Sequence, residues 1–299
     1  MGKNLNFSGH ESFQCRNLWP KKGFDFIHQD SGDFHSDEAV LSLGVGKNMT
    51  TSIRYWLDAF GFKKQNEKTS SYTVGQNLLA NEGWDPYLEN IGSLWLLHFE
   101  LVRNDFASIY SLVFNHFRKY RTEFTKKHLL SFIKSKTLET NSLPADSTLE
   151  TDIGVFLKTY LQPNSKNSRK NIEDHFSSLL MELSLIKEIE DIEHRDGEKE
   201  KWYKFEQSTQ ETLPVEVFLY SILDNEHFGN SISIQALLNA ENSPGSVFLL
   251  NPDTVISKIE ELATLYERIV YKEDAGIREL QILENIDPID VLNSYYGRS

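Results

Sequence analysis

A glycine-containing break between two helical patterns constrains the fold of this 299-residue chain more than any other feature. Ser36 is a favourable N-cap for a first helix over residues 38–43, because its side chain can accept a hydrogen bond from a free backbone N–H. Gly44-Val45-Gly46 interrupts that helix, and a longer one is predicted over residues 47–59, with Gly61 at its end. Two helices joined by so short a turn are typical of a helix-turn-helix.

The second of these helices is amphipathic. The apolar side chains that recur at helical spacing, and should face the core, are Met49, Ile53, Trp56, Leu57 and Phe60. The opposite face is expected to present Asn48, Thr51, Arg54, Tyr55 and Asp58 to solvent. Residues 62–74 surround a polar turn and predict a β-hairpin, so we expect a winged helix-turn-helix domain over residues 1–80.

The outward side chains of this domain are of the kinds that bind DNA. Those suited to base edges in the major groove are Asn48, Thr51, Arg54 and Tyr55. Those suited to phosphates are Lys47 at the helix N-terminus and Lys63, Lys64 and Lys68 on the wing. The alternative is that the unit serves only for packing or for binding another protein.

The rest of the chain predicts a mainly α-helical, multi-domain protein with small β-hairpins, built from further winged-helix-like units. A long helical region starts near residue 85, and later helices are predicted over residues 151–160, 172–183, 215–223, 234–238 and 253–265. Hairpins are predicted over residues 185–205 and 269–282. The predicted domains after the first are a helical connector (81–140), a winged-helix-like middle domain (141–210) and an acidic winged-helix-like domain (211–299).

Charge is distributed unevenly along the chain, whose net charge is −13. Residues 1–170 contain 21 Lys and Arg against 18 Asp and Glu, whereas residues 171–299 contain 10 against 26. The near-neutral first part can therefore carry a local basic patch, and a basic run at residues 118–121 could extend a DNA path or be a solvated helix face. The acidic part is either a solvated surface or a docking face for a protein.

The single cysteine, Cys15, excludes an intramolecular disulfide and fits a reducing compartment. No apolar stretch is long enough to cross a bilayer or to serve as a signal peptide. We therefore expect a cytoplasmic protein without a membrane partner.

A group of polar residues near the N-terminus offers a candidate metal site. A nuclease needs carboxylates, and often a histidine, around a divalent ion. The candidates are His10, Glu11, Asp85, Glu89 and His98. No spacing typical of a metal motif is present, so the favoured alternative is that His10, Glu11 and Arg16 fix the N-terminal loop by hydrogen bonds and ion pairs. His98 lies in an apolar helix and is expected in the core.

Several of these segments resemble a prokaryotic family known as domain of unknown function 4007. The matching segments are residues 7–13 with Arg16 and Trp19, 43–49, 52–56, 85–86, 88–89 and 93–98, with weaker matches at 172–174, 243–245 and 275–276. The resemblance implies a role beside cysteine desulfurase and ATP-dependent sulfurtransferase proteins that place phosphorothioate sulfur in DNA, as anti-phage defence. Members of its Ssp-type branch nick DNA, which implies a nicking endonuclease here.

Our leading hypothesis is therefore a DNA-binding component of a phosphorothioate modification system that nicks DNA with Mg²⁺ or Mn²⁺. In this hypothesis His10, Glu11 and Asp85 are catalytic, and Arg16, Lys47 and Arg54 hold the phosphate. The second hypothesis is a non-enzymatic adaptor that positions the sulfur-transfer enzymes through its acidic part. A protein-only scaffold and a homodimer stay open.

Overall fold

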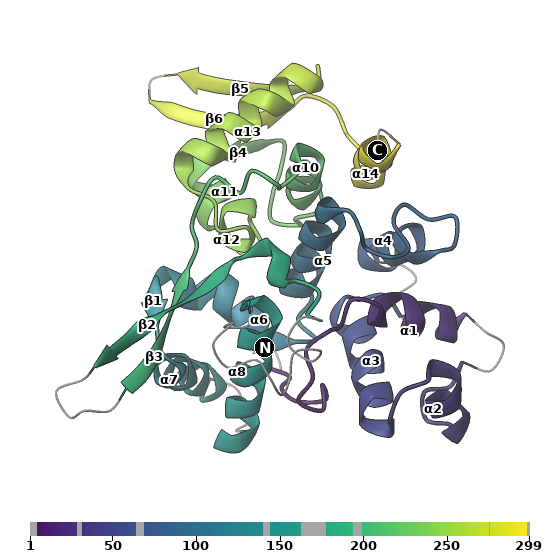
Figure 1. Cartoon of the computed structure of the whole chain (residues 1–299). Coiled ribbons are helices and arrows are strands. Elements are labelled where there is room, and N and C mark those ends of the chain that lie inside the picture. Colours follow the sequence, from purple (N-terminus) through teal and green to yellow (C-terminus); the bar gives the residue numbers. More distant parts are fainter. Residues whose placement is uncertain are drawn as a thin grey trace.

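The computed structural model describes residues 5–28, 32–63, 69–139, 144–162, 178–193, 199–274 and 276–297. These residues form a mainly helical protein with two three-stranded antiparallel sheets, which confirms the predicted mainly α-helical class with small β-hairpins (Figure 1). Within them, no helix combines the length and the apolar character that a membrane span requires.

The N-terminal part is helical and contains α1 (Trp19–Ile27), α2 (Asp37–Leu43), α3 (Lys47–Ala59) and α4 (Ser70–Leu79). The predicted turn is present, because Gly44 ends α2 in the left-handed conformation, at φ 63°, which a glycine adopts without steric cost. Helix α1 packs across α3, and a Cβ on Gly23 would lie only 2.7 Å from Cγ2 of Ile53. The helix-turn-helix prediction for residues 36–60 is thus confirmed in its helices and its turn.

The predicted wing is wrong where the structure describes it. Residues 70–74, expected as the second strand of a hairpin, form the start of α4. Thr69 caps this helix by accepting a hydrogen bond from the Tyr72 backbone N–H, and Val74 and Leu78 are buried on one helical face. Lys64 and Lys68 lie outside the described residues.

Helix α5 (Ile91–Arg103) runs through the centre of the molecule, and residues 92–102 are all buried. It begins the predicted long helical region, which continues as α6 (Ser108–Ser111), the π-helix η2 (Leu112–His116) and the 3₁₀-helix η3 (Phe117–Lys119). One continuous hydrophobic core joins these elements to the rest of the chain.

A middle unit follows from residue 108 onward. Its further elements are β1 (Glu123–Phe124), α7 (Lys126–Thr137), α8 (Asp146–Tyr160), η4 (Met181–Leu183), β2 (Ile186–Glu193) and β3 (Lys199–Phe205). The strands pair in the order β1-β3-β2, so the predicted hairpin is confirmed and gains a strand from the predicted connector. The described residues 178–183 form a β-bridge, a turn and a 3₁₀-helix, so the α-helix predicted over residues 172–183 does not extend through them.

The C-terminal unit repeats this arrangement. Its elements are α10 (Val215–Leu223), β4 (Ser231–Ser233), α11 (Ile234–Asn239), α12 (Pro244–Val247), α13 (Pro252–Leu265), β5 (Ile269–Asp274) and β6 (Ile277–Ile282). The strand order β4-β6-β5 matches that of the middle unit, position for position. The predicted helices and hairpin of this region are confirmed.

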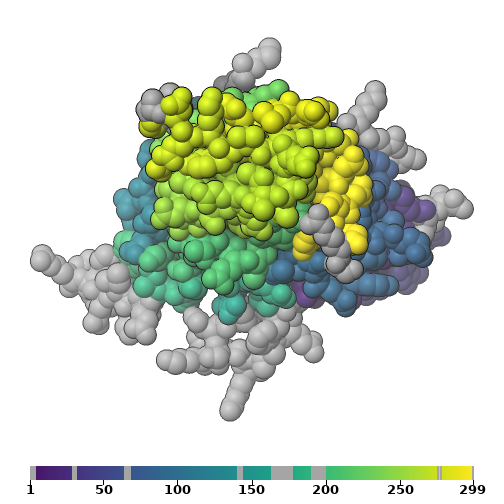
Figure 2. Space-filling view, turned by 90° about the horizontal axis from the view of Figure 1, so that it is seen from above, coloured from purple at the N-terminus to yellow at the C-terminus, as the bar shows by residue number. Residues whose placement is uncertain are grey.

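A last helix, α14 (Pro288–Tyr296), was not predicted. It packs on α10 and returns to the N-terminal part, where the rings of Tyr296 and Trp84 stack at 4.9 Å. Figure 2 shows this helix, in yellow, against blue segments from the first third of the chain. The C-terminal helix thus packs both on the C-terminal unit and on the segment that precedes α5.

Candidate nucleic-acid interface

The start of α3 is open to solvent. Lys47 and Asn48 are exposed, and Thr51 is partly exposed one turn later. A Cβ on Gly44 or Gly46 would meet no atom within 4 Å, so the turn that precedes the helix is uncovered by described residues. The N-cap Gly46 offers no side-chain acceptor, so the first backbone N–H groups of α3 carry a positive dipole toward solvent.

Arg54 continues this surface on the next turn of α3. It is partly exposed, and its guanidinium donates a hydrogen bond to Nε2 of His35, just before α2. Lys63 differs, because its ammonium group pairs with the carboxylate of Asp58. Burial raises the pKa of Asp58, while hydrogen bonding and charge from Lys63 act in the opposite direction. Lys63 therefore offers less free charge than the sequence suggests.

Tyr55 does not lie on the outward face, contrary to the prediction. Only 6% of the residue is exposed, and its ring packs 5.4 Å from that of His10 and 5.3 Å from that of Phe106. Burial raises the pKa of its hydroxyl well above the usual value. Tyr55 lies at the boundary of the apolar face of α3, and its side chain packs into the core. It therefore cannot reach a base edge in this conformation.

Contacts of His10 hold the N-terminal loop against α8. Its Nε2 contacts the Asp152 carboxylate, and its Nδ1 accepts a hydrogen bond from the Ser12 backbone N–H at 3.1 Å. The Ser8 backbone N–H donates to both Asp152 oxygens, at 3.0 and 3.1 Å. Both ring nitrogens of His10 are therefore engaged by the protein itself, as expected of a residue that fixes the loop.

The backbone of this loop is strained. Ser8, Glu11 and Ser12 have φ values of 73°, 49° and 65°, in the left-handed region that disfavours side chains. The Asp152 contacts hold the loop in that conformation. Glu11, at its tip, is exposed.

Arg16 lies at the other end of the loop and is partly buried. Its guanidinium carbon lies 5.8 Å from the centre of the Phe13 ring and 5.4 Å from that of Trp19. Such a position between aromatic rings stabilises the cation and orients it. Arg16 thus supports the loop, whatever it binds.

Asp85 has a structural environment separate from that of His10. Its carboxylate accepts hydrogen bonds from the backbone N–H groups of Glu89 and Asn90, at 3.0 and 2.9 Å, and from the Ser93 hydroxyl at 2.7 Å. These contacts organise the start of α5. His98 is fully buried, as predicted, and lies between the Tyr160 hydroxyl and a backbone carbonyl.

The candidate metal ligands do not form one site. His10 is held by Ser12 and Asp152, Asp85 is held by the backbone before α5 and by Ser93, and Glu11 and Glu89 are exposed. Over the described ranges, no group of three or more His, Cys, Asp and Glu side chains is placed to hold a metal ion. These candidates are therefore not gathered at one point among the described residues, and the expected Mg²⁺ or Mn²⁺ centre stays a prediction.

Asp152 is the central residue of the loop site that sequence reasoning missed. It is 3% exposed and occupies the apolar face of α8, three residues after Leu149 and four before Phe156. A carboxylate at such a position must find a buried partner, because burying an unpaired charge is costly. That pattern was visible in the sequence, but the partner, 142 residues away, was not.

Comparisons with known proteins agree on the relatives of this chain. A family model described as "Protein of unknown function (DUF4007)" matches residues 7–296. The structure titled "Magnesium ion-bound SspB crystal structure" is similar at a TM-score of 0.84 and 26% identity, over 98% of this chain and 88% of that chain. The structure titled "SspB crystal structure" gives 0.82 and 27% over the same shares. No curated protein sequence matches. The name SspB in both titles confirms the suspected Ssp-type relationship.

Proposed function

Because the chain belongs to the DUF4007 family and is similar to SspB throughout, we propose that it is a DNA-binding component of a phosphorothioate modification system. The observation that carries this proposal is the uncovered start of α3, which follows a tight turn and presents Lys47, Asn48, Thr51 and Arg54. A helix presented in this way can enter the major groove by its N-terminal end, where its dipole also attracts phosphate.

The charge on the two later units favours α3, by comparison, as the helix that contacts DNA. We infer that both are winged-helix units, since each has a helix, a strand, further helices and then a two-stranded hairpin, with the third strand central in the sheet. The helix in the recognition position is α8 in one and α13 in the other. Glu150 is exposed on α8, and Asp253, Glu260 and Glu261 are exposed on α13. These carboxylates would repel phosphates, so neither helix suits a DNA groove.

The acidic C-terminal unit suits a protein partner better than DNA. Residues 211–299 carry 15 acidic against 5 basic side chains. We propose that this unit docks the cysteine desulfurase or the ATP-dependent sulfurtransferase of the system.

The first experiment measures DNA binding with and without the proposed contacts. Arg54→Ala should weaken duplex binding by about 1–3 kcal/mol if Arg54 reads a base, with some loss of sequence preference. Lys158→Ala is a matched control, because Lys158 is an exposed cation on α8 and is not one of the proposed contacts. An unchanged affinity for Arg54→Ala, or an equal loss for Lys158→Ala, would remove α3 from the interface.

Strand nicking is proposed as the activity of this component. A supercoiled plasmid is incubated with the protein and Mg²⁺, Mn²⁺ or EDTA, and Glu11→Ala serves as the variant. Open-circular product that disappears with EDTA and with Glu11→Ala supports the nickase. A product that persists in Glu11→Ala removes that residue from the chemistry.

The adaptor without catalysis is the second candidate, and the internal contacts of His10 and Asp85 favour it. It predicts duplex binding without cleavage under every metal condition. A protein-only scaffold predicts no salt-dependent DNA binding at all.

A further inference from the structure

A second cationic surface lies on the middle unit, at the start of α7. We call it the basic ridge, and its members are Lys119, Arg121, Lys126, Lys127 and Lys204, all of them exposed. They come from the end of η3, the segment before β1, the first turn of α7 and the outer face of β3. A ring contact at 5.5 Å between His128 and Trp202 joins α7 to β3, so these segments lie against each other.

Few carboxylates offset this charge. Glu123 is the register partner of Lys204, and Glu200 lies 3.5 Å from the Lys127 ammonium. The Lys119 ammonium donates to a backbone carbonyl, and the charge of Glu241 also acts on it. In a chain of net charge −13, five cations against three carboxylates make a locally positive surface.

Two lysines of the basic ridge lie at the end of a helix where the helix dipole disfavours cations. Lys126 and Lys127 occupy the first turn of α7, which contains no acidic residue. The helix dipole places partial positive charge at that end, so cations there reduce helix stability. Residues that reduce local stability are expected at binding surfaces. Here a bound anion would relieve the repulsion between these two lysines and the helix dipole.

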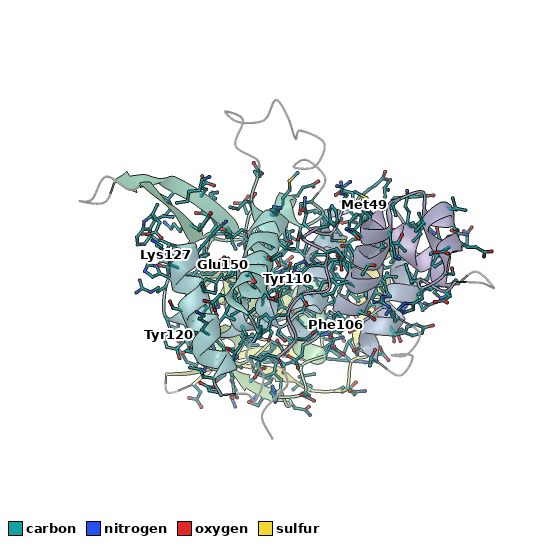
Figure 3. All side chains as sticks on the ribbon, turned by 90° about the horizontal axis from the view of Figure 1, so that it is seen from below. Met49, Phe106, Tyr110, Tyr120, Lys127 and Glu150 are labelled. Atoms are coloured by element: carbon teal, nitrogen blue, oxygen red, sulfur yellow. The ribbon has the colours of Figure 1, made fainter. Side chains whose placement is uncertain are left out.

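An exposed aromatic ring lies within the ridge. Tyr120 is 73% exposed between Lys119 and Arg121, and one side of its ring packs at 5.9 Å from Phe132 of α7. Figure 3 shows Tyr120 and Lys127 along the same edge of the molecule, with Met49 of α3 at the opposite side. A supported aromatic ring flanked by cations is the arrangement that binds an unpaired base by stacking and its backbone by charge.

We propose that the basic ridge binds single-stranded DNA, with Tyr120 as the stacking residue and Arg121 and Lys126 as phosphate contacts. This inference deepens the proposed function, because it gives the protein a site for an unpaired strand apart from the duplex contact of α3. It does not depend on α3, so the two can fail separately.

The test uses the full chain and two labelled probes, a 12-nucleotide oligothymidylate and a 12-base-pair duplex, in fluorescence anisotropy. Tyr120→Ala should weaken oligothymidylate binding by roughly ten-fold and leave duplex binding within about two-fold. Tyr120→Phe keeps the ring and should bind as the wild type does. An oligothymidylate affinity unchanged by Tyr120→Ala, or an equal loss for the duplex, overturns the stacking role.

A second variant keeps the test valid if loss of the Tyr120 ring disturbs α7. The double variant Arg121→Ala/Lys126→Ala removes exposed charge only, and should lower the salt dependence of oligothymidylate binding by a slope of about 1.4. The matched control is Lys134→Ala/Lys136→Ala, which removes two cations from the same helix that already pair with Asp146 and Glu139. An equal effect of the control overturns the site, and so does equal competition by polyglutamate, which would indicate a general polyanion or acidic-protein surface.

Discussion

Acidification should destabilise the fold through His98 of α5. This ring is fully buried, its Nε2–H donates to the Val247 carbonyl at 2.9 Å, and its Nδ1 accepts from the Tyr160 hydroxyl at 2.9 Å. One neutral tautomer satisfies both partners. Burial lowers the pKa of His98 from 6.5 to about 4, while the Val247 hydrogen bond opposes that shift.

The sign and size of the effect follow from linkage. The unfolded state takes up a proton near pH 6.5 and the folded state only near pH 4. The stability that the neutral His98 ring contributes is therefore complete above pH 6.5 and is lost as the pH falls through 4. About 2.5 pH units at 1.36 kcal/mol each correspond to about 3 kcal/mol. Roughly 2.5 kcal/mol of this loss should occur between about pH 7 and 4.5.

Urea unfolding at about pH 7 and 4.5 measures the loss in the free energy of unfolding. A variant without His98 shows how much of that loss comes from this residue. His98→Gln is less stable at neutral pH, but its side chain does not titrate. The wild type should therefore lose about 2.5 kcal/mol more than His98→Gln on acidification. Equal losses in the two proteins would show that His98 is not the group responsible.

Three further changes test contacts between distant segments. Asp152→Ala leaves the buried His10 ring without its partner and should lower the free energy of unfolding by about 2–4 kcal/mol in urea; Asp152→Asn should lose less, and equal losses would contradict the pairing. Gly92→Ala places a Cβ 2.8 Å from Cζ of Tyr295 and should loosen α14. Limited proteolysis should therefore remove the C-terminus faster, and an unchanged rate would argue against the packing of α14 on this part of the chain. Glu100→Gln removes the fully buried carboxylate charge that pairs with the partly buried Arg103 and should cost about 3 kcal/mol by thermal unfolding, whereas a neutral result would show that the charge is dispensable.

The sequence predicted elements whose signals are local. The helix-turn-helix followed from Ser36 at the N-cap position, from Gly44 and from the apolar spacing of residues 47–59, although the Ser36 side chain makes no capping hydrogen bond. The hairpin at 269–282 followed from apolar strands around Gly276. Such signals lie within a few residues of each other, so they survive without tertiary information.

Two helices were missed for different reasons. Residues 70–74 include β-branched and aromatic side chains that favour a strand, but the Thr69 cap and the packing of Gly75 against Phe62 select a helix. Helix α14 has a start signal that was overlooked, since Asp287 caps it and Pro288 occupies its first position. The first error was a tertiary effect, whereas the second was avoidable.

The candidate site was only partly accessible from the sequence. Exposure of Lys47 and Asn48 followed from helical periodicity, but the burial of Tyr55 depends on the loop that carries His10 and on Phe106. The likeness of the middle and C-terminal units was expected from their helix and hairpin patterns, but the short strands β1 and β4 that complete their sheets were not predicted.

Hydrogen–deuterium exchange with and without duplex DNA tests the central claim most directly. DNA bound at the start of α3 should slow exchange of the backbone amides of residues 44–51, whose turn is uncovered in the free protein. Exchange on the acidic helix α13 should stay the same. Slower exchange on α13 with no change over residues 44–51 would contradict the account.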